Sequence, residues 1–246
     1  MIICLTSSPS GPLGVPNDGW LDEKNGFVEN LKQYWKPEMK GLIIAASPDQ
    51  YERNDEMCDF FTRAFRNNGV PVSGSFEVWD YRCVDRISQA WLQQYDVVML
   101  SGGHVPTEHA YFQKIHLREL LEGYEGIILG VSAGTMNSAE VVYAQPEESG
   151  ESVDSDFKRF ITGLGLTRIN VLPHYQMIKD FYLDGKRLME DITYPDSFGR
   201  RFIALEDGSY ILIADGVSRL YGRAHLISDG KISLICEDGQ SMIIEE

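Results

Sequence analysis

Short aliphatic runs that alternate with longer amphipathic segments constrain the fold of this chain more than any other feature. Runs such as 41–47 (GLIIAAS) and 126–133 (GIILGVSA) are apolar on consecutive residues rather than on alternate ones. Consecutive apolar residues are typical of strands that helices cover on both faces. The alternation therefore predicts an α/β fold with a doubly wound, mostly parallel sheet flanked by helices.

The expected strands are short and rich in aliphatic residues, and they cover 2–8, 41–47, 73–80, 96–103, 126–133, 169–175, 202–207, 209–215 and 231–237. Helical patterns cover 54–70 with Asn54 as cap, 107–124, 135–144 and, more weakly, 180–192. The last strands follow one another through Gly-containing turns, which predicts an antiparallel C-terminal extension. Two irregular loops, 7–19 and 145–156, do not resemble linkers between domains, so we expect residues 1–246 to form a single domain.

The composition limits the partners and the compartment. With 37 acidic and 22 basic residues the formal net charge is −15, which repels phosphate backbones and disfavours nucleic acid. No basic amphipathic segment and no long apolar run indicates contact with a membrane. The four cysteines, Cys4, Cys58, Cys83 and Cys236, have no CxxC spacing, which is typical of free thiols rather than zinc ligands. We therefore expect a cytoplasmic protein.

One strand ends in a motif that can carry chemistry. In GVSAG, Gly130, Ser132 and Gly134 match G-x-S-x-G, in which small neighbours allow a sharp turn from strand to helix. Such a turn lifts the serine hydroxyl above the sheet edge and directs backbone N–H groups to one point. The motif favours a nucleophile elbow at Ser132, and the alternative is a plain glycine turn beside a helix cap.

A serine nucleophile requires a base, because a free hydroxyl stays protonated near neutral pH. Of the five histidines, His104 (SGGHVPTE) and His174 (NVLPHYQ) follow apolar runs. Sites of open α/β sheets gather at the carboxyl ends of parallel strands, which favours these two over the others.

The remaining groups of such a site are a carboxylate and oxyanion donors. Glu206 and Asp207 end a predicted strand and are candidates to orient the histidine, in competition with Glu140, Glu147 and Glu148. Gly102 and Gly103 allow close approach of the backbone to a ligand, so their N–H groups could complete an oxyanion hole with that of Ala133. A plain tight turn explains the Gly-Gly pair equally well.

These motifs together resemble the S51 serine peptidases, a family that includes peptidase E (the aspartyl dipeptidases) and the cyanophycinases and is related to the class I glutamine amidotransferase-like fold. The resemblance rests on GVSAGT at 130–135, the Gly-Gly loop upstream and LPH at 172–174, and it covers the chain from about Gly41 onwards. The order Ser, His, acid differs from the Ser, acid, His order of α/β-hydrolases, so a generic esterase is disfavoured.

The resemblance implies Ser132 as nucleophile, His174 as base, Asp207 as the acid with Glu206 as the alternative, and Gly103 and Ala133 as oxyanion donors. It implies no metal and no cofactor. Family members carry Gly-Gly-Gly followed by Asn or Asp in the upstream loop, whereas this chain has SGGHVPTE, which puts His104 at the rim of the site.

We therefore hypothesise a serine peptidase that acts on a small peptide substrate. The resemblance implies Asp-Xaa dipeptides as candidate substrates. A preference for aspartate requires a cation, for which Arg168, Lys179, Arg200 and Arg201 are the candidates. The alternative is a non-hydrolytic small-molecule-binding or regulatory module on the same fold. Both a monomer and a homodimer are compatible with the sequence.

Overall fold

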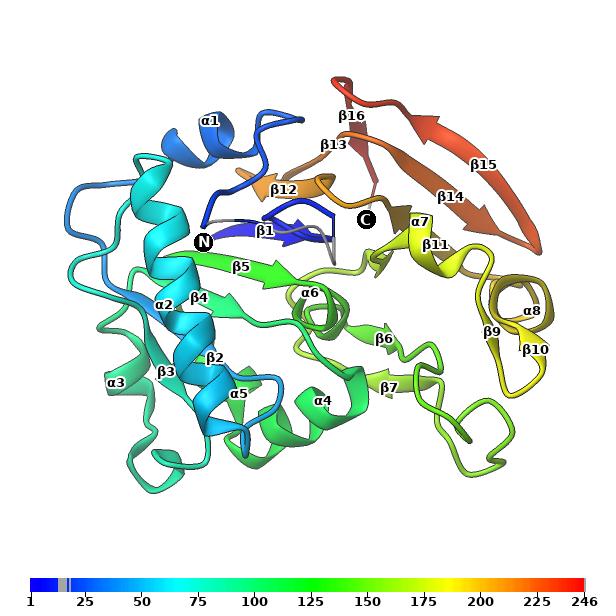
Figure 1. The fold of residues 1–246 in the computed structure, drawn as a ribbon, viewed down its shortest axis with the longest axis horizontal. Coiled ribbons are helices and arrows are strands. Elements are labelled where there is room, and N and C mark those ends of the chain that lie inside the picture. Colours follow the sequence, from blue (N-terminus) through cyan, green and yellow to red (C-terminus); the bar gives the residue numbers. More distant parts are fainter. Residues whose placement is uncertain (13–16, 18, 246) are drawn as a thin grey trace.

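The main sheet has eight strands and holds the parallel core of the fold (Figure 1). The structure is a computed structural model that describes residues 1–12, 17 and 19–245. The strand order is β16-β13-β12-β1-β5-β4-β2-β3, and the strands β1, β5, β4, β2 and β3 pair in parallel. Their bounds are Ile2–Thr6 (β1), Gly41–Ile44 (β2), Glu77–Trp79 (β3), Val97–Leu100 (β4), Ile127–Val131 (β5), Tyr210–Ala214 (β12), Val217–Tyr221 (β13) and Ser241–Ile244 (β16).

Helices cover both faces of this sheet. Successive residues of a strand point to opposite sides, so each strand packs against both helical layers. Val97 and Met99 of β4 pack with α1 (Phe27–Lys32) and α2 (Tyr51–Asn67). Val98 and Leu100 pack on the other side with α3 (Gln89–Leu92), α4 (Val105–Lys114) and α5 (Leu117–Leu120). A short 3-10 turn, η1, spans Val84–Arg86. This layering confirms the predicted doubly wound α/β class.

A second sheet of four strands stands beside the first, in the order β15-β14-β11-β8. Its bounds are Asn170–Leu172 (β8), Arg201–Leu205 (β11), Ala224–Ser228 (β14) and Lys231–Cys236 (β15), and β8 and β11 pair in parallel. A third core cluster joins this sheet to α6 (Ala133–Asn137) and to the hairpin of β6 (Val141–Tyr143) and β7 (Phe160–Thr162). The predicted antiparallel extension is therefore divided: β12, β13 and β16 extend the main sheet, and β14 and β15 extend the second.

The segment 180–192 is not the helix that its pattern predicted. It forms a small hairpin of β9 (Tyr182–Leu183) and β10 (Lys186–Arg187), followed by a π-helix, η2 (Leu188–Thr193), and a short α8 (Tyr194–Asp196). The hairpin loop is Asp184-Gly185 with both φ angles positive, the dipeptide that favours a tight hairpin turn.

Three other helix predictions differ at their ends. The segment 107–124 is two helices, α4 and α5, because His116 adopts a left-handed φ of 53° between them. The segment 135–144 is helical only to Asn137 and then forms β6, whose two valines and tyrosine favour a strand. Helix α2 begins at Tyr51, so Asn54 is not its cap, and α7 (Tyr175–Ile178) is a single turn.

The structure describes one of the two irregular loops completely and the other in part. In the loop 7–19, residues 13–16 and 18 lie outside the described residues. The loop 145–156 is well organised: Glu151 accepts the backbone N–H groups of Glu147 and Glu148, and Asp184 accepts those of Gly150 and Ser152.

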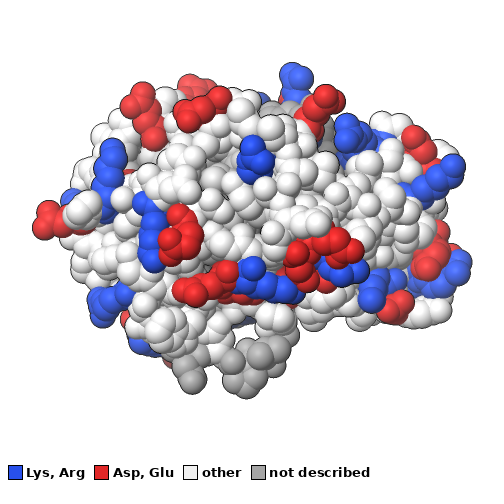
Figure 2. Space-filling model, turned by 90° about the horizontal axis from the view of Figure 1, so that it is seen from above, with Lys and Arg blue, Asp and Glu red and all other residues white. Residues whose placement is uncertain are grey.

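In the described residues, the surface charges and the cysteine thiols agree with what the composition predicts. On the face shown in Figure 2, acidic and basic side chains are interspersed and basic ones form no continuous patch. All four cysteines are buried free thiols. No helix in the described part of the chain has the length and apolar character to cross a membrane.

We expect Gly134→Ala to destabilise the fold strongly. A Cβ at Gly134 would lie 2.2 Å from the carbonyl oxygen of Leu100, so β4 and α6 would have to separate. The loss in unfolding free energy should reach roughly 3 kcal/mol, the upper end of the overpacking range. Urea denaturation measures it. Gly123→Ala is the control, since nothing lies within 4 Å there and only its φ of 71° costs about 1 kcal/mol. Equal losses would contradict the packing argument.

Candidate active site

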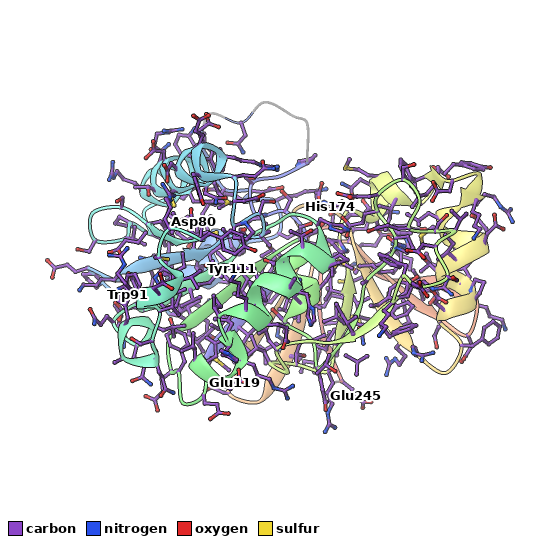
Figure 3. All side chains as sticks on the ribbon, turned by 90° about the horizontal axis from the view of Figure 1, so that it is seen from below. Asp80, Trp91, Tyr111, Glu119, His174 and Glu245 are labelled. Atoms are coloured by element: carbon purple, nitrogen blue, oxygen red, sulfur yellow. The ribbon has the colours of Figure 1, made fainter. Side chains whose placement is uncertain are left out.

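Five segments converge where parallel strands of both sheets end, the usual place for a site in α/β folds. Ser7 follows β1, Gly102 and Gly103 follow β4, and Ser132 follows β5 in the main sheet. His174 follows β8 and Asp207 follows β11 in the second sheet. Figure 3 labels His174 near the middle of the molecule, between the helices that flank the main sheet and the segment that follows β8. The site is therefore assembled from two sheets.

Ser132 occupies a strained turn between β5 and α6. Its φ of 51° and ψ of −112° lie outside the regions that L-residues ordinarily adopt. The small neighbours are required: a Cβ at Gly130 would lie 2.8 Å from the Cα of Thr135, and one at Gly134 would meet Leu100. A strained serine between small residues at a strand-to-helix turn is the geometry that a nucleophile elbow requires.

A continuous hydrogen-bond chain runs from Ser132 to Asp207. Ser132 Oγ lies 2.8 Å from His174 Nε2, and His174 Nδ1 lies 2.6 Å from Asp207 Oδ1. The carboxylate can only accept from Nδ1–H, which leaves Nε2 free to accept the serine proton. The Asp207 side chain is buried, and 13% of the His174 side chain stays exposed to solvent. This geometry makes Ser132 a potential nucleophile with a base and an orienting acid.

Ser7 and Gln176 hold the acid end of this chain, and sequence reasoning missed both. Ser7 Oγ accepts the backbone N–H of His174 at 2.8 Å and donates to Asp207 Oδ1 at 2.7 Å. Gln176 donates to Asp207 Oδ2 at 2.6 Å and accepts the backbone N–H of Asp207 at 3.1 Å. Asp207 is thus fixed at both carboxylate oxygens. A serine at the end of the first strand was the only signal that could have indicated Ser7.

The backbone N–H groups of Gly103 and Ala133, the two predicted oxyanion donors, donate no hydrogen bond to any described residue, and neither does that of Gly102. Ala133 is the first residue of α6, where N–H groups have no partner within the helix. The Gly-Gly loop passes close to the elbow, since a Cβ at Gly102 would lie 3.2 Å from that of Ser132. Unpaired donors at this place can stabilise an oxyanion.

The alternative site residues point elsewhere. Glu206 pairs with Arg223, with 3.3 Å between Oε1 and Nε, and makes no hydrogen bond to His174. His104 bonds Thr107 through Nδ1 and Glu151 through Nε2, each at 2.8 Å, and so joins the Gly-Gly loop to the loop 145–156. His104 therefore supports the rim and lies outside the chain that ends at Ser132.

A cavity of about 400 Å³ opens next to Ser132, and its lining includes a cation that sequence reasoning did not select. Arg53 of α2 lines it, together with Glu147 from the loop 145–156. The cations expected near the substrate do not line this cavity: Arg168, Arg200 and Arg201 surround a different one, at the opposite ends of β8 and β11. Lys179 does not line the cavity at Ser132 either.

Two acids near the site have raised pKa values. Although the Glu147 side chain is exposed at the cavity, desolvation by the atoms packed around it raises its pKa to about 7, and the neighbouring His104 opposes the shift. Burial also raises the pKa of Glu108 on α4 well above its ordinary value, and its carboxyl accepts a hydrogen bond from Asn137 of α6 at 2.8 Å. Glu108 is fully buried, and burial disfavours its charged form.

Among the described residues, one group has the donor set of a cation site. His104, Glu148 and Glu151 each place one ligand atom within 4.8 Å of the others. The His104 and Glu151 atoms already bond each other, so the group serves as a structural contact of the loop 145–156.

The fold of this chain is peptidase E-like, as comparison with two solved structures shows. It matches the structure of a peptidase from an acI-B1 Actinobacterium with a TM-score of 0.64 at 15% identity, over 99% of this chain and 96% of that one. It also matches a structure from Listeria monocytogenes EGD-e, provisionally described as a peptidase E, with a TM-score of 0.57 at 14% identity, over 88% and 96% of the two chains. No family model and no curated sequence matches the chain.

We expect Ser7→Ala to reduce the nucleophilicity of Ser132. The variant removes one hydrogen bond to the acid and one acceptor for the backbone of His174, so labelling of Ser132 by a fluorophosphonate should slow by roughly 10-fold. Stopped-time mass spectrometry measures the rate. In an Asp207→Asn background the same substitution should have a much smaller effect, because its partner is changed. Additive effects of the two substitutions would contradict this coupling.

We expect Glu147→Gln to change the pH dependence of stability. Because the folded-state pKa of Glu147 is raised to about 7, folding of the wild type becomes less favourable as pH rises from its ordinary pKa of 4.5 to about 7. The variant lacks this penalty, so its melting temperature relative to wild type should rise over that window and stay constant above it. A constant difference from pH 4 to 8 would refute the desolvation of Glu147.

Proposed function

We propose that this protein is a serine-type peptidase of the peptidase E type that hydrolyses short peptides. The observation that supports the proposal most strongly is the hydrogen-bond chain from Ser132 through His174 to Asp207, beside two unpaired N–H groups. The peptidase-like fold of the two matched structures agrees with it. A chain that only bound a small molecule would need no such alignment of serine, imidazole and acid.

The reaction follows from this geometry. Ser132 Oγ attacks the carbonyl carbon of the scissile bond while His174 Nε2 takes its proton. The N–H groups of Gly103 and Ala133 hold the negative charge that develops on the carbonyl oxygen. Protonated His174 then gives the proton to the leaving amine, and the C–N bond breaks. Water, deprotonated by His174, hydrolyses the acyl-enzyme and restores Ser132. Asp207 keeps the imidazole in the required tautomer throughout.

The substrate is proposed to be a short peptide, with Asp-Xaa dipeptides as the first to examine. The cavity at Ser132 is of a size for one or two residues rather than for a folded chain. The ordered loop 145–156 and α2 both border it, which limits the length of peptide that fits.

We expect Ser132→Ala to abolish release of amino acids from a dipeptide panel that includes Asp-Xaa. The loss in kcat should be about a millionfold, as for removal of a serine nucleophile elsewhere. Asp207→Asn should lower kcat by roughly 10⁴-fold, because the asparagine favours the wrong imidazole tautomer. Ninhydrin or mass-spectrometric detection of free amino acids measures both.

The control is Glu206→Gln, whose side chain pairs with Arg223 and makes no hydrogen bond to His174. It should retain most of the wild-type activity. Activity that survives Ser132→Ala, or that depends on Glu206 rather than Asp207, would overturn the assignment. Stoichiometric ligand binding without turnover would instead favour a binding module.

A further inference from the structure

The two glycines between β4 and α4, Gly102 and Gly103, form no backbone hydrogen bond with any described residue, either as donor or as acceptor. Glycine has the greatest backbone freedom of all residues, so this pair does not fix its own geometry. Close packing limits movement on one side, since a Cβ at Gly103 would lie 2.7 Å from that of Ala46. The direction of the Gly103 N–H therefore depends on the residues that flank the two glycines.

The residue before the glycines is held by three hydrogen bonds. Ser101 donates its N–H to the carbonyl of Ile44 at 3.1 Å, and its hydroxyl accepts the N–H of Ala46 at 2.8 Å. Its carbonyl accepts the N–H of Gly134 at 3.1 Å. One end of the glycine pair is thus fixed both to the end of β2 and to the turn that carries Ser132.

The residue after the glycines is held by its side chain. His104 Nε2 lies 2.8 Å from Glu151 Oε1, and Nδ1 lies 2.8 Å from Thr107 Oγ1. A carboxylate can only accept a hydrogen bond, so Nε2–H is the donor to Glu151. The side chains of His104 and Glu151 are only 19% and 15% exposed, which limits the competition from water. Both ring nitrogens of His104 are therefore occupied, and the ring is fixed.

Glu151 is itself fixed, so it can serve as an anchor. Its second oxygen, Oε2, accepts the backbone N–H groups of Glu147 and Glu148 at 2.8 and 2.9 Å. On its other side, the loop 145–156 donates two more backbone N–H groups to Asp184 in the turn between β9 and β10. The contact between His104 and Glu151 therefore attaches the end of the glycine pair to a loop that is ordered from both sides.

We propose that His104, held by Glu151, is a positioning residue that fixes the N–H of Gly103 as an oxyanion donor. The inference rests on the proposed peptidase activity. The oxyanion exists only in the transition state and the tetrahedral intermediate, so a displaced Gly103 N–H should slow the chemical step and leave binding of the substrate almost unchanged. The loop 145–156 thereby acquires a role in catalysis, although none of its residues takes part in bond formation.

The test measures kcat and KM on the dipeptide that wild type hydrolyses best. His104→Ala should lower kcat roughly 10- to 100-fold, somewhat less than complete loss of an oxyanion donor, and change KM by no more than about twofold. His104→Gln retains an N–H donor that can reach Glu151, so it should recover most of the lost kcat. Glu151→Ala should resemble His104→Ala, and the double variant should be no slower than either single one, because both remove the same contact.

His109→Ala is the matched control. His109 also lies on α4, and its Nε2 also bonds a neighbouring segment, the carbonyl of Thr162 in β7, at 2.8 Å. It should keep the kcat of wild type, and melting temperatures of all variants separate lost catalysis from lost folding. The inference is overturned if His109→Ala loses as much kcat as His104→Ala, if His104→Gln does not recover activity, or if the effects of His104→Ala and Glu151→Ala add.

Failure of the peptidase proposal has a different signature, namely no turnover of any peptide while a fluorophosphonate still labels Ser132. In that reagent the phosphoryl oxygen takes the place of the oxyanion as Ser132 Oγ displaces fluoride. The labelling rate should then fall 10-fold or more in His104→Ala and stay near that of wild type in His104→Gln and His109→Ala. Equal labelling of wild type and His104→Ala refutes the inference alone, and absence of Ser132 labelling in wild type refutes both proposals.

Discussion

The geometry of the site depends on the two hydrogen bonds that the hydroxyl of Ser7 forms. It accepts the N–H of His174 and donates to Asp207, so one side chain at the end of β1 fixes two groups from the second sheet. β1 also pairs in parallel with β5, whose end carries Ser132. The main sheet therefore holds the serine directly and holds its base and acid through Ser7. A shift of either sheet would break the alignment of all three groups.

The strained backbone of Ser132 is maintained by close packing on both sides of it. Gly130 and Gly134 let the elbow approach Thr135 and Leu100, and the hydroxyl of Thr135 donates to the carbonyl of Thr6 in β1. Such contacts stabilise a conformation that costs of order 1–3 kcal/mol. The same turn leaves the N–H of Ala133 without an acceptor among the described residues, so the strain and the candidate oxyanion donor have a common origin.

The sequence predicted the parts that follow local rules and missed those that depend on distant contacts. Glycine spacing marked Ser132, and the strand-end rule made His174 and Asp207 candidates beside His104 and Glu206. The family resemblance then selected among them. Ser7 contacts Asp207 across 200 positions, and no local pattern encodes that pair. The segment 180–192 failed for a local reason, because its Asp-Gly turn was outweighed by an approximate helical period. Nor does the order of strands in the chain reveal that the C-terminal strands divide between two sheets.

In so acidic a chain, the placement of individual charges carries more information than the total. Burial raises the pKa of Glu108 and so disfavours its charged form, and its contact with Asn137 ties α4 to α6, the helices behind the two candidate oxyanion donors. Arg82 is a cation with acidic partners, since it forms ion pairs with both Asp55 and Asp80. Arg53 of α2 differs from both, because its side chain is exposed and no described residue forms an ion pair with it.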